Sequence, residues 1–136
     1  KIAGLDPRPV DDALVPKVTF CEPEIASVGL SEARAAEVHG AENVTTAEFN
    51  VAGNARSQIL GTQGFVKLVS LKDGPIVGFH AIGARMGEQV GEGQLIVSWE
   101  ADAHDVASLV HAHPTQNETI GEAAMVLAGK SLHNHG

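Results

Sequence analysis

The stretch GFVKLVSLKDGPIVGFHAIG, residues 64 to 83, predicts the centre of the fold. It holds two runs rich in β-branched and aromatic residues, 65–71 and 76–82, with Asp73-Gly74 between them. An Asp-Gly pair between two such runs is a strong signal for a tight β-hairpin turn. The sequence therefore predicts an antiparallel pair of strands in the middle of the chain.

Further strands are predicted before this hairpin, in the β-branched or alternating runs at 15–20, 25–30 and 44–51. A helix is expected over 32–38, between Ser31 as a good N-cap and Gly40 as the stop. Residues 52–62 are rich in small and polar side chains and are expected to form a loop.

After Gly87 the apolar residues recur at helical rather than strand spacing. Helices are expected at 88–101, 105–110 and 118–128, the last stopped by Gly129. Strands followed by helices indicate an α+β fold, with an antiparallel β-sheet and helices packed on one side of it.

Length and composition suit one globular domain. The 136 residues are 43% hydrophobic, and no apolar run is long enough to span a bilayer, so no membrane is expected as a partner. The first residues, rich in proline and without an initiator Met, predict that 1–14 is a linker from absent upstream domains and that 15–136 is the domain.

The net charge of −8 argues against nucleic acid, which binds mainly through Lys and Arg on phosphates. The lone Cys21 cannot form an internal disulfide, and it is expected to be a buried, inert thiol. One unpaired Cys fits a reducing compartment, so a cytoplasmic or mitochondrial matrix location is expected, and secretion is not. Neither GxGxxG nor GxxxxGK[ST] occurs, so any nucleotide cofactor would be held mainly by other parts of a larger protein.

The segment His111-Ala112-His113-Pro114-Thr115-Gln116-Asn117-Glu118 carries the candidate chemistry. Thr115 and Glu118 fit a helix capping box, in which each side chain would bond the backbone amide of the other residue. His113 and Glu118 equally fit an acid–base pair, because imidazole titrates near neutrality and a carboxylate on its second nitrogen would fix the tautomer. A metal site at the two histidines lacks a third ligand at a recognisable spacing, and His113 as a satisfied core residue remains a fourth reading. Spacing alone leaves these four readings open.

The phrase HPTxxE at 113–118 resembles the C-terminal signature of the pyridine-nucleotide disulfide oxidoreductases. Three further segments resemble this family in the expected order: PEIASVG at 23–29, GFVKL at 64–68, and VGFHAIG at 77–83 followed by Gly87-Glu88. The form HAHPT and the ending AGKSLH at 128–133 are most similar to the dihydrolipoamide dehydrogenase branch.

The resemblance implies a C-terminal dimerisation domain of a flavoprotein with FAD and NAD as cofactors. It implies that His113 and Glu118 are the acid–base pair of a homodimer, supplied to the flavin and disulfide of the partner subunit. His113 and Pro114, joined by a cis bond, would lie near that FAD, and no metal is implied. The dithiol would be dihydrolipoamide, free or on the lipoyl domain of a 2-oxo acid dehydrogenase complex.

Two alternatives stay open beside this reading. The domain could serve another disulfide reductase of the glutathione, mycothione or mercuric type, or it could be a dimerisation module without a catalytic role. On either reading the isolated 136 residues are expected to be inactive, because the flavin, disulfide and nicotinamide sites lie elsewhere. His80, His104, His133 and His135 are expected to be non-catalytic, and Trp99 is expected in the core or at the dimer contact.

Overall fold

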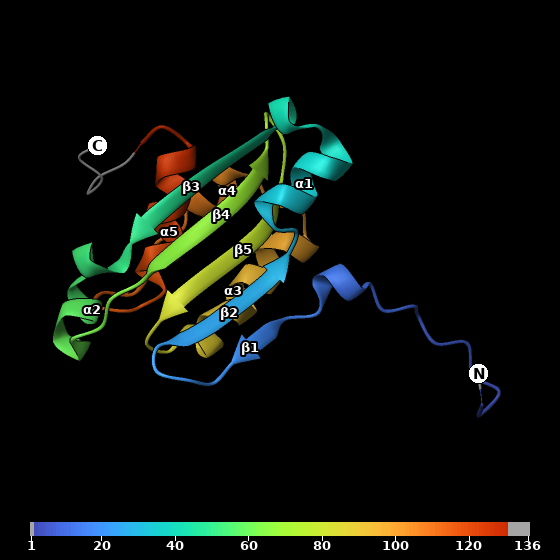
Figure 1. The fold of residues 1–136 in the computed structure, drawn as a ribbon, viewed down its shortest axis with the longest axis horizontal. Helices are drawn as coiled ribbons and strands as arrows, with labels where there is room; N and C mark the ends of the chain where they lie inside the picture. The colour runs from blue at the N-terminus through green and yellow to red at the C-terminus, as the bar shows by residue number, and fades with distance from the viewer. Residues whose placement is uncertain (1, 131–136) are drawn as a thin grey trace.

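The fold is built on a five-stranded antiparallel sheet (Figure 1). The computed structural model describes residues 2–130, in which the strands are β1 (Lys17–Thr19), β2 (Glu24–Gly29), β3 (Val44–Asn50), β4 (Phe65–Leu71) and β5 (Ile76–Gly83). Their order across the sheet is β1-β2-β5-β4-β3. The predicted hairpin is confirmed as β4–β5, in which Leu68 lies opposite Phe79.

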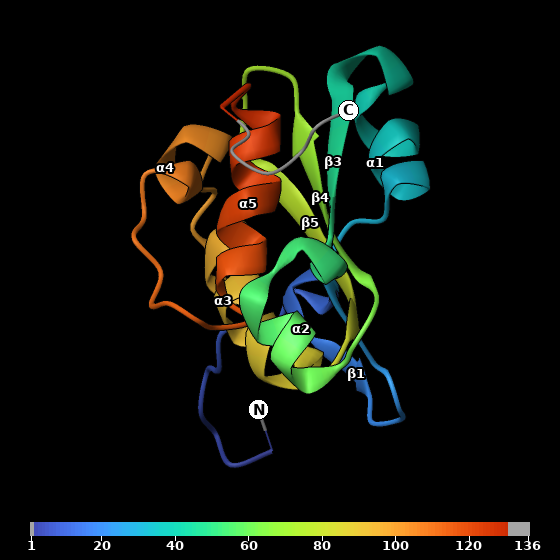
Figure 2. The same cartoon turned by 90° about the vertical axis from the view of Figure 1, so that its left-hand side faces the viewer.

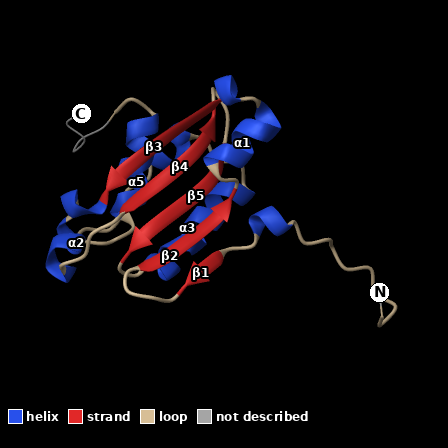
Figure 3. Ribbon diagram, in the orientation of Figure 1, coloured by secondary structure: helices blue, strands red, loops and turns tan. Residues whose placement is uncertain are grey.

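Five helices are present among the described residues: α1 (Glu32–His39), α2 (Ala55–Leu60), α3 (Met86–Ser98), α4 (Ala103–Ala107) and α5 (Glu118–Leu127). Single 3-10 turns lie at Asp12–Leu14 (η1), Ala41–Asn43 (η2) and Val51–Gly53 (η3). Figure 2, which views the sheet edge-on, shows α3, α4 and α5 on one side of it and α1 on the other, and in Figure 3 α3 and α5 lie behind the strands. The α+β prediction is therefore confirmed, and α1 adds a small cover at one corner of the other face.

The core lies between the sheet and helices α3 and α5. Phe79 and Leu68 on the sheet and Ile120 on α5 are fully buried there. On α3, a Cβ added to Gly93 would lie 2.6 Å from Cγ of Phe79, so the absence of a side chain lets this helix approach the sheet closely. Ile120 lies in the first turn of α5, so the core also holds the start of the helix that follows the candidate site in the chain.

The prediction of a loop at 52–62 is wrong, because η3 and α2 occupy most of it. Asn54 caps α2, since its Oδ1 accepts a hydrogen bond from the Ser57 N–H at 3.0 Å. Gly61 ends the helix in the left-handed conformation, with φ of 64°. A six-residue helix is too short to be stable by itself, so its composition gave little periodic signal and its tertiary bonds decide it.

Two of the expected helices are displaced along the chain. The helix expected at 88–101 covers 86–98, and the one expected at 105–110 covers 103–107. Asp102 explains the second shift, because its Oδ1 accepts from the backbone N–H groups of His104 and Asp105 and starts α4 there.

Trp99, expected in the core or at the dimer contact, and Cys21, expected to be buried, both lie at the surface of the domain. Trp99 is 76% exposed, which excludes the core and leaves the dimer contact as a prediction. Cys21 is also exposed, because it lies in the β1–β2 connection with its thiol 3.0 Å from the carbonyl oxygen of Pro23.

The predictions for the two ends of the chain are not tested by the described residues. His133, His135 and most of the AGKSLH ending lie outside the described residues, and the boundary at residue 14 stays a prediction. Within 2–130, no helix combines the length and the apolar character that a membrane crossing requires.

Candidate active site

The candidate site lies on the loop between α4 and α5 and on the first turn of α5. The peptide bond between His113 and Pro114 is cis. Nδ1 of His113 lies 2.8 Å from Oε1 of Glu118. Since an ionised carboxylate can only accept, the proton of this bond belongs to Nδ1, and Nε2 is the nitrogen left free to accept another.

Glu118 serves a second partner with its other oxygen. The backbone N–H of Thr115 donates to Oε2 of Glu118 at 2.8 Å. The Thr115 hydroxyl does not complete the capping box, because it donates to the carbonyl of Ala112 at 2.6 Å. Only half of the predicted capping box is therefore present. This half coexists with the imidazole–carboxylate pair, because Oε2 of Glu118 satisfies the Thr115 amide and Oε1 holds the imidazole.

The pair is open on one side. The His113 side chain is 70% exposed and that of Glu118 is 24% exposed. Beside them is a hollow of about 140 Å³ lined by residues that include Phe49, Gly53 and Glu122. His113 is therefore not a satisfied core residue, since most of its imidazole is open to solvent.

The pKa of Glu118 lies below its ordinary value. Burial of the carboxyl raises the pKa, but the hydrogen bond from Thr115 and the contacts with His113 and His111 lower it by more. Glu118 is accordingly an anion at neutral pH, which is the form that accepts both hydrogen bonds.

A second imidazole–carboxylate pair braces the same loop from α3. His111 Nε2 lies 2.7 Å from Oε1 of Glu92, and Nδ2 of Asn117 donates to Oε2 of Glu92 at 2.6 Å. One carboxylate thereby holds both ends of the segment 111–117. Glu92 was not singled out from the sequence, because it lies 19 residues before His111 and no local pattern joins them.

The structure also brings α2 to the loop. Asn54 Nδ2 donates to the Thr115 carbonyl at 3.1 Å, and Ser57 Oγ donates to Oε1 of Gln116 at 2.7 Å. Sequence reasoning missed both residues, and the only signal was the Asn-x-x-Ser spacing of a helix N-cap.

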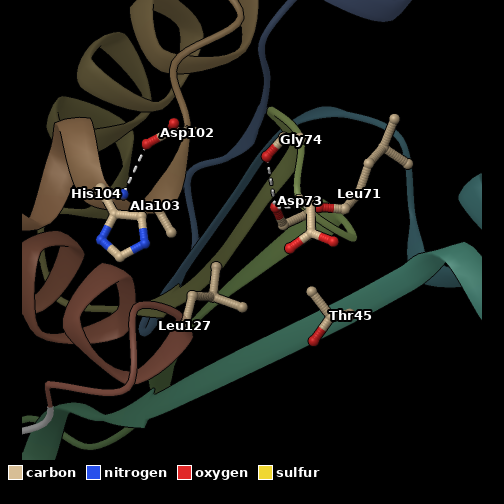
Figure 4. Close-up of a pocket in the computed structure, with 9 residues that line it drawn as sticks. Thr45, Leu71, Asp73, Gly74, Asp102, Ala103, His104 and Leu127 are labelled. Carbon is tan, nitrogen blue, oxygen red and sulfur yellow. Dashed lines mark hydrogen bonds between the residues drawn. The ribbon is translucent and has the colours of Figure 1, made fainter.

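A second hollow of about 260 Å³ lies near the other end of α5 (Figure 4), lined by residues that include Asp73, Asp102 and Leu127. It contains no residue of the segment 111–118. Across residues 2–130, no three His, Cys, Asp or Glu side chains form a group that could hold a metal ion. His111 and His113 instead bind two different carboxylates, Glu92 and Glu118.

Fold and site together define an α+β domain that carries a solvent-exposed imidazole–carboxylate pair at the start of its last helix. Residues 15–124 match the dimerisation domain of the pyridine nucleotide-disulphide oxidoreductases. The chain belongs to this family, and the resemblance seen in its motifs is confirmed.

Its relatives include dihydrolipoyl dehydrogenases of Bacillus subtilis, 39% identical over 96% of this chain, and of Geobacillus stearothermophilus, 41% identical over 97%. The chain spans 28% of the length of each. The crystal structure of LpdA from Mycobacterium tuberculosis has the same fold, with a TM-score of 0.82 and 23% identity over 93% of this chain and 28% of that one.

Proposed function

We propose that this domain supplies the proton-transferring base of an FAD- and NAD-dependent dihydrolipoyl dehydrogenase. The observation that carries the proposal is the 2.8 Å contact between His113 Nδ1 and Glu118 Oε1, on a side chain that is otherwise open to solvent. The names of the relatives support the lipoamide substrate, and the matched family supports a homodimer.

His113 would act through Nε2. This nitrogen accepts the proton of a dihydrolipoamide S–H, and the thiolate so formed attacks the disulfide of the partner subunit. The imidazolium that results is stabilised by the Glu118 carboxylate on the opposite side of the ring. The imidazolium would then return its proton to the thiolate released from the disulfide, which regenerates Nε2 as a base. Nε2 would accept the proton of the second substrate S–H, and attack of that thiolate on the substrate sulfur of the mixed disulfide would release lipoamide and leave the partner's disulfide reduced.

The chain is compatible with a flavin that is bound mainly by other domains of a larger protein. No glycine-rich phosphate loop is present in its sequence, and the His113–Pro114 segment is open at the surface. The bound flavin would carry the electrons from the partner's dithiol to NAD+. The contribution of this chain is the base, the carboxylate that orients it and the loop that carries both.

His113→Gln in the full-length flavoprotein tests the proposal. Oxidation of dihydrolipoamide with NAD+ should fall by about 10²- to 10⁴-fold, the usual contribution of a positioned base. Flavin content and dimerisation should be retained. His39→Gln, an exposed histidine of α1, is the matched control and should keep full activity.

Near-normal turnover of the His113→Gln protein would remove the base assignment and favour a purely structural dimerisation module. Turnover of glutathione disulfide but not of dihydrolipoamide by the unmodified protein would keep the base and correct the substrate.

A further inference from the structure

A buried chain of side-chain hydrogen bonds joins α2 to the loop that carries the proposed base. Ser57 Oγ donates to Oε1 of Gln116 at 2.7 Å, and Nε2 of Gln116 donates to the carbonyl of Ala84 at 2.9 Å. Ser57 is fully buried and Gln116 is 4% exposed. Both ends of the Gln116 amide are thus bonded in a place with little access for water.

Asn54 makes a second link beside the first. Its Nδ2 donates to the carbonyl of Thr115, while its Oδ1 accepts from the Ser57 backbone N–H. The same N-cap therefore orders the first turn of α2 and holds the residue before Gln116. Asn54 is also buried, so both links are shielded from solvent.

These two hydrogen-bonded links hold the segment between His113 and Glu118 in place. Thr115 and Gln116 follow Pro114 directly and precede Glu118 by three and two residues. Thr115 also donates its backbone N–H to Glu118. A shift of this segment would change where Nε2 of His113 lies relative to a substrate held by another subunit, and misplacement by about 1 Å can cost roughly 100-fold in rate.

We propose that Ser57 is a positioning residue for His113, acting through Gln116. The inference rests on the proposed function, since it assigns Ser57 a role in the proton transfer of that reaction. Without the Ser57 hydroxyl, Oε1 of Gln116 would be buried without a donor, and such a group moves toward water or another partner. The loop then leaves the position in which His113 meets the dithiol.

The test uses Ser57→Ala in the full-length flavoprotein and two reactions of the same protein. Oxidation of dihydrolipoamide requires the base. Reduction of ferricyanide by NADH requires the flavin but neither the dithiol nor His113. We expect kcat for dihydrolipoamide to fall by about 10- to 100-fold with KM little changed, and the ferricyanide rate to stay normal.

Three further variants sharpen the result. Ser57→Thr keeps the hydroxyl and should recover most of the rate. Ser57→Cys keeps the volume with a weaker donor, so it replaces Ser57→Ala if that protein fails to fold, with the same outcomes expected. Gln58→Ala, on the neighbouring exposed residue of α2, is the control and should retain both activities.

Unchanged dihydrolipoamide oxidation in Ser57→Ala or Ser57→Cys would overturn the inference. An equal loss of both reactions would also overturn it, because Ser57 would then serve only the stability of the fold. If the unmodified protein reduces ferricyanide but cannot oxidise dihydrolipoamide, the proposed function fails, and the role of Ser57 fails with it.

Discussion

Glu118 binds two N–H donors with two different oxygens, and this decides what a substitution there would do. A carboxylate offers acceptors on both sides, whereas a glutamine amide offers an oxygen on one side and N–H donors on the other. One of the two donors, His113 Nδ1–H or Thr115 N–H, would then face an NH₂ group.

Glu118→Gln in the full-length protein should therefore lower kcat for dithiol oxidation by about 10- to 100-fold. This range corresponds to the loss of one hydrogen bond to a charged group, roughly 1.5–3 kcal/mol. Steady-state kinetics measures it, with Glu37→Gln on exposed α1 as a charge-matched control. Equal rates in the two variants would show that the charge of Glu118 does not support His113.

The His111–Glu92 pair should make the folding stability of the chain depend on pH. The hydrogen bond to Glu92 raises the pKa of His111 above its ordinary 6.5, and burial only partly opposes this. Burial raises the pKa of Glu92, but its hydrogen bonds to His111 and Asn117 have a larger opposite effect, so the pKa lies below its ordinary 4.5. The His111 contribution is complete below pH 6.5 and is lost as pH rises through the raised folded pKa. The Glu92 contribution is present above pH 4.5 and is lost as pH falls through the lowered one.

His111→Gln should therefore lower the melting temperature of the 136-residue chain more at pH 5.5, where both partners are charged, than at pH 9, where the imidazole is neutral. Thermal unfolding followed by circular dichroism measures both differences. A His111→Gln effect of the same size at both pH values would mean that the pair contributes as a neutral hydrogen bond.

At the scale of elements, α3 lies so close to the sheet that one of its positions has no room for a side chain. Gly93 faces Phe79, whereas Gly91 on the same helix has nothing within 4 Å of an added Cβ. The two glycines therefore separate packing from helix propensity.

Gly93→Ala should destabilise the chain by about 1–3 kcal/mol, because the new methyl group overpacks against Phe79. Gly91→Ala should stabilise it by about 0.5–1 kcal/mol, since alanine loses less backbone freedom in a helix. Midpoints of urea unfolding give both values. Two stabilising substitutions would mean that α3 sits farther from β5 than the structure places it.

For the whole molecule, the family predicts association with a second copy, and the exposed apolar side chains indicate where. Leu95 and Trp99 near the end of α3 and Leu109 after α4 are exposed around a hollow of about 300 Å³. Monomeric proteins rarely leave such patches uncovered.

Trp99→Gln should weaken self-association of the chain by roughly 30-fold or more, as loss of a central aromatic anchor costs about 2 kcal/mol. Sedimentation equilibrium over a range of concentrations measures the constant. Val38→Gln, an exposed apolar position on α1 across the sheet, should leave it unchanged. Equal effects of the two substitutions would mean that Trp99 is not in the contact. A chain that stays monomeric at all concentrations would mean that this surface does not support self-association by itself.

Features that depend on near neighbours in the chain could be predicted from local signals. The β4–β5 hairpin followed from two runs rich in β-branched and aromatic residues joined by Asp73-Gly74, because turn chemistry acts within a few residues. The His113–Glu118 pair followed from a spacing of five residues and a matching motif. That both hydrogen bonds of Glu118 could coexist was decided only by its geometry.

The contacts that hold the loop of this pair in place became visible only in the folded domain. Glu92 lies 19 residues from His111, Ser57 59 residues from Gln116, and Asn54 61 residues from Thr115. No repeat or spacing in the sequence encodes these contacts, since they form only when α2 and α3 pack beside the loop. For the same reason α2 was predicted as a loop, because a short helix depends on its tertiary bonds. The prediction for Trp99 left the core and the dimer contact open, because hydrophobicity does not say whether an apolar side chain is covered by its own chain or by another.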